Sequence, residues 1–125
     1  MTLAKICIFL GSLNALFAVA LGAFGAHTLK AKLTTDMLVV YQTAVQYHFY
    51  HALGLLIIGL VAFHLPNNLW LKPSAILMFL GILLFCGSLY AMSVFNVRGI
   101  GMITPIGGLL FILAWLVLSI SVWRS

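Results

Sequence analysis

Four apolar stretches, each about as long as a membrane-spanning helix, constrain this chain more than any other feature. They cover roughly residues 6–26, 37–63, 74–95 and 100–123. A helix needs about 20 apolar residues to cross the hydrocarbon core of a bilayer. The segments between the stretches are short, and short connections make neighbouring helices antiparallel. The sequence therefore predicts an all-α integral membrane bundle of four transmembrane helices, with residues 1–125 forming a single membrane domain.

The composition supports a lipid environment and argues against nucleic acid as a partner. Hydrophobic residues make up 65% of the chain and charged residues 6%, whereas soluble domains are about 25% charged. The formal charge is +5, but the basic residues are scattered near the ends of the apolar stretches, as in head-group anchoring. The count of basic residues does not decide the orientation in the membrane, because each side has three. Lys5, Lys72 and Arg124 lie on the side of the termini, and Lys30, Lys32 and Arg98 lie on the other.

The segments between the apolar stretches carry signals for helix starts and turns. Residues 27–33 form a mixed linker that we expect to lie in the interface as a short helix. Thr34 is expected to cap the second helix, with Asp36 in its first turn, where a negative charge suits the helix dipole. Residues 65–68 contain a Pro-Asn turn signal, and Pro73 fits the first turn of the third helix.

Small residues form one stripe along the first predicted helix. Steps of three and four place them on one face together with an asparagine. Such stripes let helix backbones approach closely in lipid. The stripe is expected to pack within the chain or, alternatively, between copies of it, and Asn14 is expected to bond another helix. Its members are Gly11, Asn14, Ala15, Ala18, Gly22 and Gly25.

The fourth stretch begins with Thr104-Pro105-Ile106-Gly107. Inside a helix a proline removes a backbone hydrogen bond and kinks the preceding turn. We expect Pro105 to kink this helix, with Thr104 bonding a freed carbonyl. The kink either shapes the packing around Gly107 or marks a broken helix beside a ligand site.

The first part of the second helix is unusually polar. Most residues from 41 to 51 carry polar atoms, and polar residues in a span usually face the protein interior. Helical spacing puts Gln42, Gln46 and Tyr50 on one side of this helix. The opposite face carries Tyr41, Ala44, Tyr47, His48 and His51. Structural hydrogen bonding, head-group contact, proton relay, and metal or haem binding all remain open. The candidate ligand-binding residues are His27, Tyr41, Tyr47, His48, His51 and Thr104.

Catalytic and cofactor chemistry has little support in this sequence. Asp36 is the only acidic residue, so no carboxylate pair exists for acid–base catalysis. No Gly-rich phosphate loop is present. His48 and His51 are three residues apart, but a metal site would need His27 or a second chain to complete it. We therefore predict no catalytic residues, no metal site and no cofactor, and a chain that is not an enzyme.

Several motifs together resemble a known family. They are residues 22–27 (GAFGAH), 41–53 (YQTAVQYHFYHAL), 87–90 (GSLY) and 101–108 (GMITPIGG). In this order they resemble domain-of-unknown-function family 423, small bacterial inner-membrane proteins with eukaryotic relatives. The resemblance covers nearly the whole chain and implies four membrane helices in the inner membrane, without supplying an activity. Matching positions are Gly25, Ala26, His27, Tyr47, His51, Thr104, Pro105 and Gly107, whereas the segment at 34–36 departs slightly from the family pattern.

Three functional hypotheses follow. The first is a non-enzymatic membrane protein that acts through helix–helix contacts with itself or a larger membrane complex. The second is a transporter or lipid-handling protein with a site at the polar half of the second helix. The third is a haem- or metal-binding redox protein that uses His48 or His51.

Overall fold

The computed structural model describes all 125 residues, and it is helical without strands. Four helical spans are long and apolar enough to cross a membrane, at Leu3–His27, Thr35–His64, Leu71–Phe95 and Gly99–Trp123. This confirms the predicted all-α fold of four transmembrane helices. The elements are α1 (Leu3–His27), η1 (Leu29–Ala31), α2 (Thr35–His64), α3 (Leu71–Gly81), η2 (Ile82–Cys86), α4 (Gly87–Phe95), η3 (Gly99–Met102) and α5 (Thr104–Trp123).

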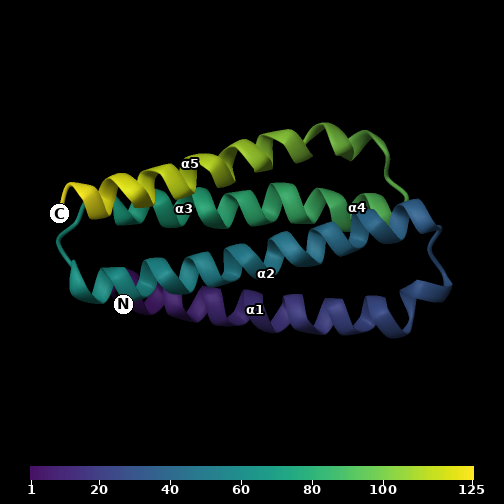
Figure 1. Cartoon of the computed structure of the whole chain (residues 1–125), viewed down its shortest axis with the longest axis horizontal. Coiled ribbons are helices and arrows are strands. Elements are labelled where there is room, and N and C mark those ends of the chain that lie inside the picture. Colours follow the sequence, from purple (N-terminus) through teal and green to yellow (C-terminus); the bar gives the residue numbers. More distant parts are fainter.

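The four spans lie side by side in an open row (Figure 1). Helix α1 packs on α2, α2 packs on the span formed by α3, η2 and α4, and α5 packs on α3 and η2. Both termini lie at the same end of the molecule. The largest hydrophobic core lies toward that end and combines side chains from all four spans. Its fully buried members include Leu55, Ile58, Leu71, Met78 and Ala114.

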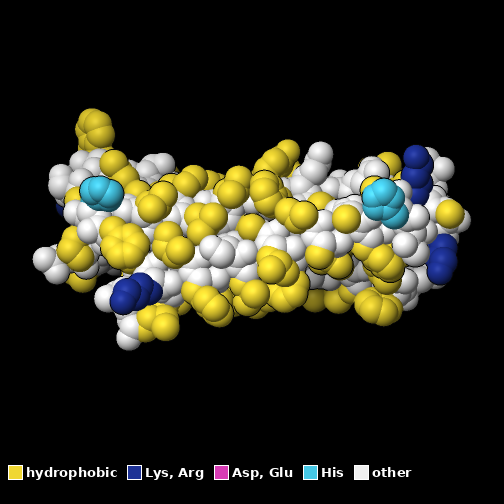
Figure 2. Space-filling view, turned by 90° about the horizontal axis from the view of Figure 1, so that it is seen from below, with side chains coloured by type: hydrophobic (Ala, Val, Ile, Leu, Met, Phe, Trp, Pro, Cys, Tyr) yellow, Lys and Arg dark blue, Asp and Glu magenta, His cyan; other side chains and the backbone are white.

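Apolar side chains cover the middle of the molecule, and charges mark its ends. Figure 2 shows one face with a broad hydrophobic band and with Lys and Arg only near the two ends. Lipid chains are the expected contact for such a band, since they have no polar groups to satisfy. The distribution is that of an integral membrane protein.

The predicted start of α2 is confirmed in detail. The Thr34 hydroxyl accepts a hydrogen bond from the backbone N–H of Met37 at 3.2 Å, and Asp36 lies in the first turn. The linker before it contains the short 3-10 helix η1, in which Leu29 is buried. Pro73 is the third residue of α3, where its missing N–H costs no helical hydrogen bond.

The prediction of a kink at Pro105 is wrong. Pro105 lies in the first turn of α5, after the separate 3-10 helix η3. The first N–H groups of a helix have no partner within the helix, so proline fits there without bending it. Thr104 bonds the hydroxyl of Ser88 in α4 instead of a freed carbonyl.

The third span contains an irregular element in its middle, the π-helical turn η2. It covers Ile82–Cys86 between α3 and α4, and glycines flank it at Gly81 and Gly87. Short π-helical turns are rare in proteins, and those that occur are often found at functional sites. The sequence patterns had given no indication of it.

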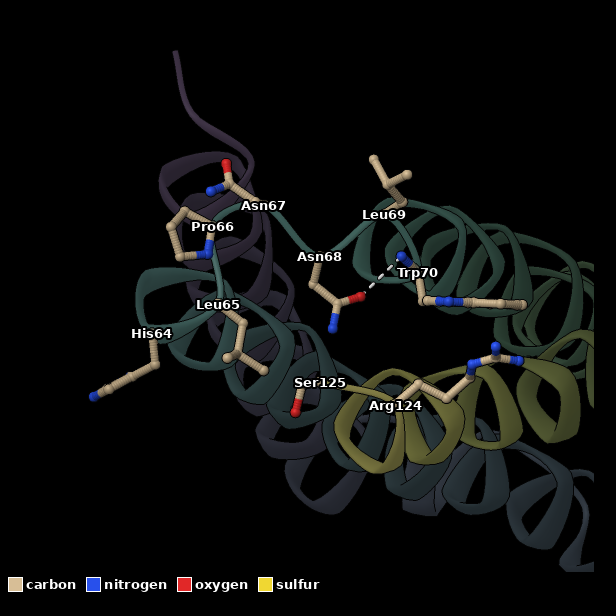
Figure 3. A pocket seen from close by; sticks show the side chains of 9 residues that line it. All are labelled: His64, Leu65, Pro66, Asn67, Asn68, Leu69, Trp70, Arg124 and Ser125. Carbon is tan, nitrogen blue, oxygen red and sulfur yellow. Dashed lines mark hydrogen bonds between the residues drawn. The ribbon is translucent and has the colours of Figure 1, made fainter.

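The turn between α2 and α3 is fixed by Asn68. Its side-chain N–H donates to the Ser121 carbonyl at 2.8 Å, and its side-chain oxygen accepts from the Trp70 backbone N–H at 3.0 Å. Figure 3 shows Asn68 and Trp70 beside a cleft, with Arg124 extending beside the Trp70 ring. The guanidinium carbon lies 6.0 Å from the ring centroid, a cation–π distance. Trp70 therefore joins the ends of α3 and α5 at the membrane interface.

Candidate functional site

The small-residue stripe of α1 packs against α2 within the same chain. A Cβ atom on Gly11 would lie 2.9 Å from the Ala52 carbonyl oxygen and 2.9 Å from the Leu56 nitrogen. At Gly25 it would lie 2.3 Å from the Tyr41 ring. The Tyr41 hydroxyl donates to the Leu21 carbonyl on α1. Tyr41 thus belongs to the α1–α2 contact.

The other members of the stripe follow the same contact less tightly. Ala18 is buried, Asn14, Ala15 and Gly22 are partly buried, and a Cβ on Gly22 would lie 3.2 Å from the Val45 side chain. The stripe therefore serves an intrachain contact in this structure, and most of the remaining surface of α1 is open to lipid.

His48 is held in a hydrogen-bonded chain across three helices. The Asn14 side-chain N–H donates to the Leu10 carbonyl at 2.8 Å, which leaves its oxygen 2.9 Å from His48 Nε2. His48 Nδ1 lies 3.0 Å from the Tyr90 hydroxyl on α4. In a neutral ring, Nε2–H donates to Asn14 and Nδ1 accepts from Tyr90. Both ring nitrogens are satisfied, so His48 is occupied in joining α1, α2 and α4.

His51 has a different environment, although it lies on the same face of α2. Its Nδ1–H donates to the Tyr47 carbonyl at 2.7 Å, because a carbonyl can only accept. Nε2 of the neutral ring is then an acceptor, and it has no partner in the chain. Only 5% of His51 is exposed, yet no fully buried side-chain nitrogen lacks a partner. The Nε2 atom therefore retains access from outside the protein.

That access is through a groove between α2, η2 and α5, here called the aromatic groove. The His51 ring stacks on Phe111 with centroids 3.5 Å apart and planes at 10°. Tyr47 contacts Phe85 at 4.7 Å between centroids. The cavity has a volume of about 610 Å³. Its lining residues are Tyr47, His51, Phe85, Pro105, Gly108, Leu109, Phe111, Ile112 and Trp115.

Glycines bring the walls of the aromatic groove together. A Cβ on Gly107 would lie 2.3 Å from the backbone nitrogen of Phe85, so α5 touches the backbone of η2 at this point. A Cβ on Gly81 would lie 2.5 Å from the Phe111 ring. These contacts bring the Phe85 and Phe111 rings together, with centroids 5.4 Å apart.

The predicted ligand-binding residues do not form one site. Tyr47 and His51 line the aromatic groove, whereas Tyr41 and His48 are used in helix contacts. His27 is exposed at the end of α1. No group of three His, Cys, Asp or Glu side chains is placed to hold a metal ion. Gln42, Gln46 and Tyr50 are exposed, and the two glutamines line a cavity of about 240 Å³ beside the small residues at the end of α1.

The sequence analysis missed the aromatic residues that η2 and α5 contribute to the aromatic groove. Phe85, Phe111 and Trp115 stand in long apolar stretches, where aromatic residues are expected anyway. A weak signal was available in the spacing of Phe111 and Trp115, four residues apart and so on one face. Only the position of α5 against His51 shows that this face meets the polar part of α2.

Comparison with known proteins places the chain in a family. The sequence model of a family described as "Protein of unknown function (DUF423)" matches residues 21–108. The chain belongs to this family. DUF423 relatives include the UPF0382 membrane protein YwdK of Bacillus subtilis (strain 168), 47% identical over 117 residues, covering 94% of this chain and 95% of the relative. A UPF0382 membrane protein of Staphylococcus saprophyticus is 47% identical over 121 residues, covering 96% and 98%. No solved structure matches the chain significantly.

The DUF423 match covers most of the aromatic groove. Residues 21–108 include Tyr47, His51, Phe85 and Pro105, whereas Phe111 and Trp115 follow the matched segment. The relatives are named only as membrane proteins, and nothing in these comparisons indicates catalysis. The resemblance read from the sequence motifs is thereby confirmed.

Proposed function

We propose that this protein is a non-enzymatic membrane protein that binds a neutral, largely apolar molecule from the bilayer in the aromatic groove. The observation that carries the proposal is the open Nε2 acceptor of His51, a residue that is otherwise buried. A buried polar group without a partner costs free energy. A ligand hydroxyl that donates to Nε2 would remove that cost.

The depth of the aromatic groove favours a neutral ligand. Phe111 stands midway along the Gly99–Trp123 span, with twelve residues on either side, and His51 stacks on it. Charged groups are costly at that depth of a membrane. No Lys, Arg, Asp or Glu side chain lines the groove. A charged head group would therefore have no counter-ion there.

The aromatic lining favours a flat ring on the ligand. Tyr47, Phe85, Phe111 and Trp115 supply ring faces and edges, which attract other aromatic rings. The Tyr47 hydroxyl and the Trp115 N–H form no hydrogen bond within the chain. A ligand hydroxyl that donates to His51 can accept from one of these groups. The ligand class is thus a ring-bearing alcohol or phenol.

The same features count against haem. His51 has the backbone-bonded Nδ1–H that ligating histidines often show. Haem, however, carries two propionate groups, and the groove offers no cation to pair with them. His48 has both ring nitrogens occupied and has none left for iron.

A matched pair of probes tests the proposal. The dissociation constants of 2-naphthol and 2-methoxynaphthalene are measured in nanodiscs and corrected for partitioning into empty nanodiscs. Only naphthol has a hydroxyl that can donate to Nε2, so it should bind about three- to ten-fold more tightly, as expected for one hydrogen bond. His51→Phe keeps an aromatic ring on Phe111 and should bring the two constants together.

The control variant is His64→Phe, because His64 is exposed at the end of α2. It should leave the preference for naphthol unchanged. Equal affinities of the wild-type protein for the two probes would contradict the proposal. A preference that persists in His51→Phe would contradict it as well.

Association with itself or a larger membrane complex stays a second proposal. The sequence feature that suggested it was the small-residue stripe containing Gly11 and Gly25. In this structure the stripe packs against α2. One surface left for such contacts is the outer face of α1, where Phe9, Leu16 and Val19 are exposed. Native mass spectrometry after mild extraction tests it, and a strict monomer without a partner would count against it.

A further inference from the structure

A second cleft lies at the end of the molecule opposite the termini, and it holds charges of both signs. It has a volume of about 750 Å³ and lies between the start of α2 and the end of α4. Lys32 and Arg98 line it together with Asp36, the only acidic side chain of the protein. We refer to it as the interfacial cleft, because it lies at the end of two membrane spans.

The charges of the interfacial cleft do not neutralise one another. The Asp36 carboxylate forms no ion pair within 4.0 Å with any cation of the chain. Lys32, Asp36 and Arg98 are all exposed. The cleft therefore offers both an acceptor for a cation and donors for an anion. A ligand that carries both charges complements it.

The cleft also offers an apolar wall. Leu33, Met37 and Met92 line it beside the charged groups and are partly buried. A molecule with a charged head and an apolar remainder would meet both kinds of surface there. Phospholipid head groups lie at this depth of a bilayer. Guanidinium groups bind phosphate oxygens with well-directed hydrogen bonds.

We infer that the interfacial cleft binds a phospholipid whose head group carries a primary amine as well as a phosphate. The phosphate meets Arg98 and Lys32, and the ammonium group donates to the Asp36 carboxylate. A quaternary ammonium group keeps its positive charge but has no N–H to donate, so choline lipids lose the hydrogen bond to Asp36. The inference is independent of the aromatic groove, which has no charged residue.

The opposite end of the molecule provides the comparison. It carries Lys5, Lys72 and Arg124 but no acidic side chain. The cleft beside Trp70 at this end (Figure 3) is lined by Arg124 and by no Lys, Asp or Glu side chain. The two ends therefore differ in their side chains, and only the Asp36 end offers an acidic side chain to an amine.

Native mass spectrometry with added lipids of identical acyl chains tests the inference. The wild-type protein should bind phosphatidylethanolamine roughly two- to five-fold more tightly than phosphatidylcholine, the scale of one exposed hydrogen bond. Asp36→Asn should bring this ratio to about one, and Asp36→Glu should restore it. Arg98→Gln should weaken binding of both lipids, whereas Lys72→Gln should leave the ratio unchanged.

Three results would overturn the inference. The first is a wild-type ratio near one, and the second is a ratio that survives Asp36→Asn. The third is competition by water-soluble phosphoethanolamine at the concentration at which the lipid binds, because it would show that the apolar wall adds nothing. The circular dichroism spectrum and melting temperature of each variant verify that α2 is still formed.

Discussion

Gly107→Ala should be among the most damaging small substitutions in this protein. The added Cβ would lie 2.3 Å from the nitrogen and 2.7 Å from the Cα of Phe85. These are backbone atoms, which cannot rotate away as a side chain can. Ordinary contact begins at 3.4 Å, so α5 and η2 must separate by about 1.1 Å at this point. Overpacking of this kind costs about 1–3 kcal/mol, and a clash with backbone belongs at the upper end.

The neighbouring glycine is a matched control. A Cβ on Gly108 would lie 3.7 Å from the Phe85 ring, which is ordinary contact. Neither glycine has a positive φ, and replacing a helical glycine by alanine stabilises the helix by about 0.5–1 kcal/mol. Gly108→Ala should therefore be neutral or slightly stabilising. The two single-methyl variants should differ by about 3 kcal/mol in the free energy of unfolding.

Unfolding by sodium dodecyl sulphate in mixed micelles, followed by tryptophan fluorescence, measures this difference. Native mass spectrometry checks that both variants keep the same oligomeric state. Similar free energies for Gly107→Ala and Gly108→Ala would refute the reasoning, because it would mean that α5 does not rest on the backbone of η2. If the reasoning holds, Gly107→Ala should also reduce the preference for naphthol, since Phe85 lines the aromatic groove.

Three further predictions concern other parts of the fold. Asn14→Ala removes the acceptor of His48 Nε2 and should lower the free energy of unfolding by about 1–3 kcal/mol, measured in the same titration. Asn96 has a φ of 56°. Asn96→Val should therefore lower the free energy of unfolding by about 1–2 kcal/mol, seen as a lower melting temperature, whereas Asn96→Gly should not. Cys7 and Cys86 are 2% and 1% exposed, so a maleimide should label neither in the folded protein and both after unfolding.

The helices and their starts could be predicted because their causes are local. Thr34 precedes an apolar stretch by a few residues and caps the helix that this stretch forms. The stripe of α1 could be recognised from helical spacing alone. Its neighbour could not, because the choice between α2 and a second copy depends on how spans distant in sequence pack.

The different environments of His48 and His51 could not be predicted for the same reason. The two side chains share one face of α2 and are both buried. Which of them is satisfied depends on Tyr90 of α4 and Phe111 of α5, residues that lie about 40 and 60 positions further along the chain. Pro105 was placed inside a helix because the apolar stretch begins near residue 100. The boundary between η3 and α5 leaves no mark in hydrophobicity.

The π-helical turn η2 also sets the phase of the third span. Each residue of an α-helix rotates the chain by about 100°, and a π turn accommodates one residue more than an α turn does. The third span is therefore one residue out of step between its two halves. Met78 faces the core before the turn, and Tyr90 faces His48 after it. A regular α-helix that kept every residue of the third span would turn one of these two faces by about 100°. Deleting one residue of the turn, such as the lipid-facing Leu83, would instead allow a regular α-helix in which Met78 and Tyr90 keep their present directions.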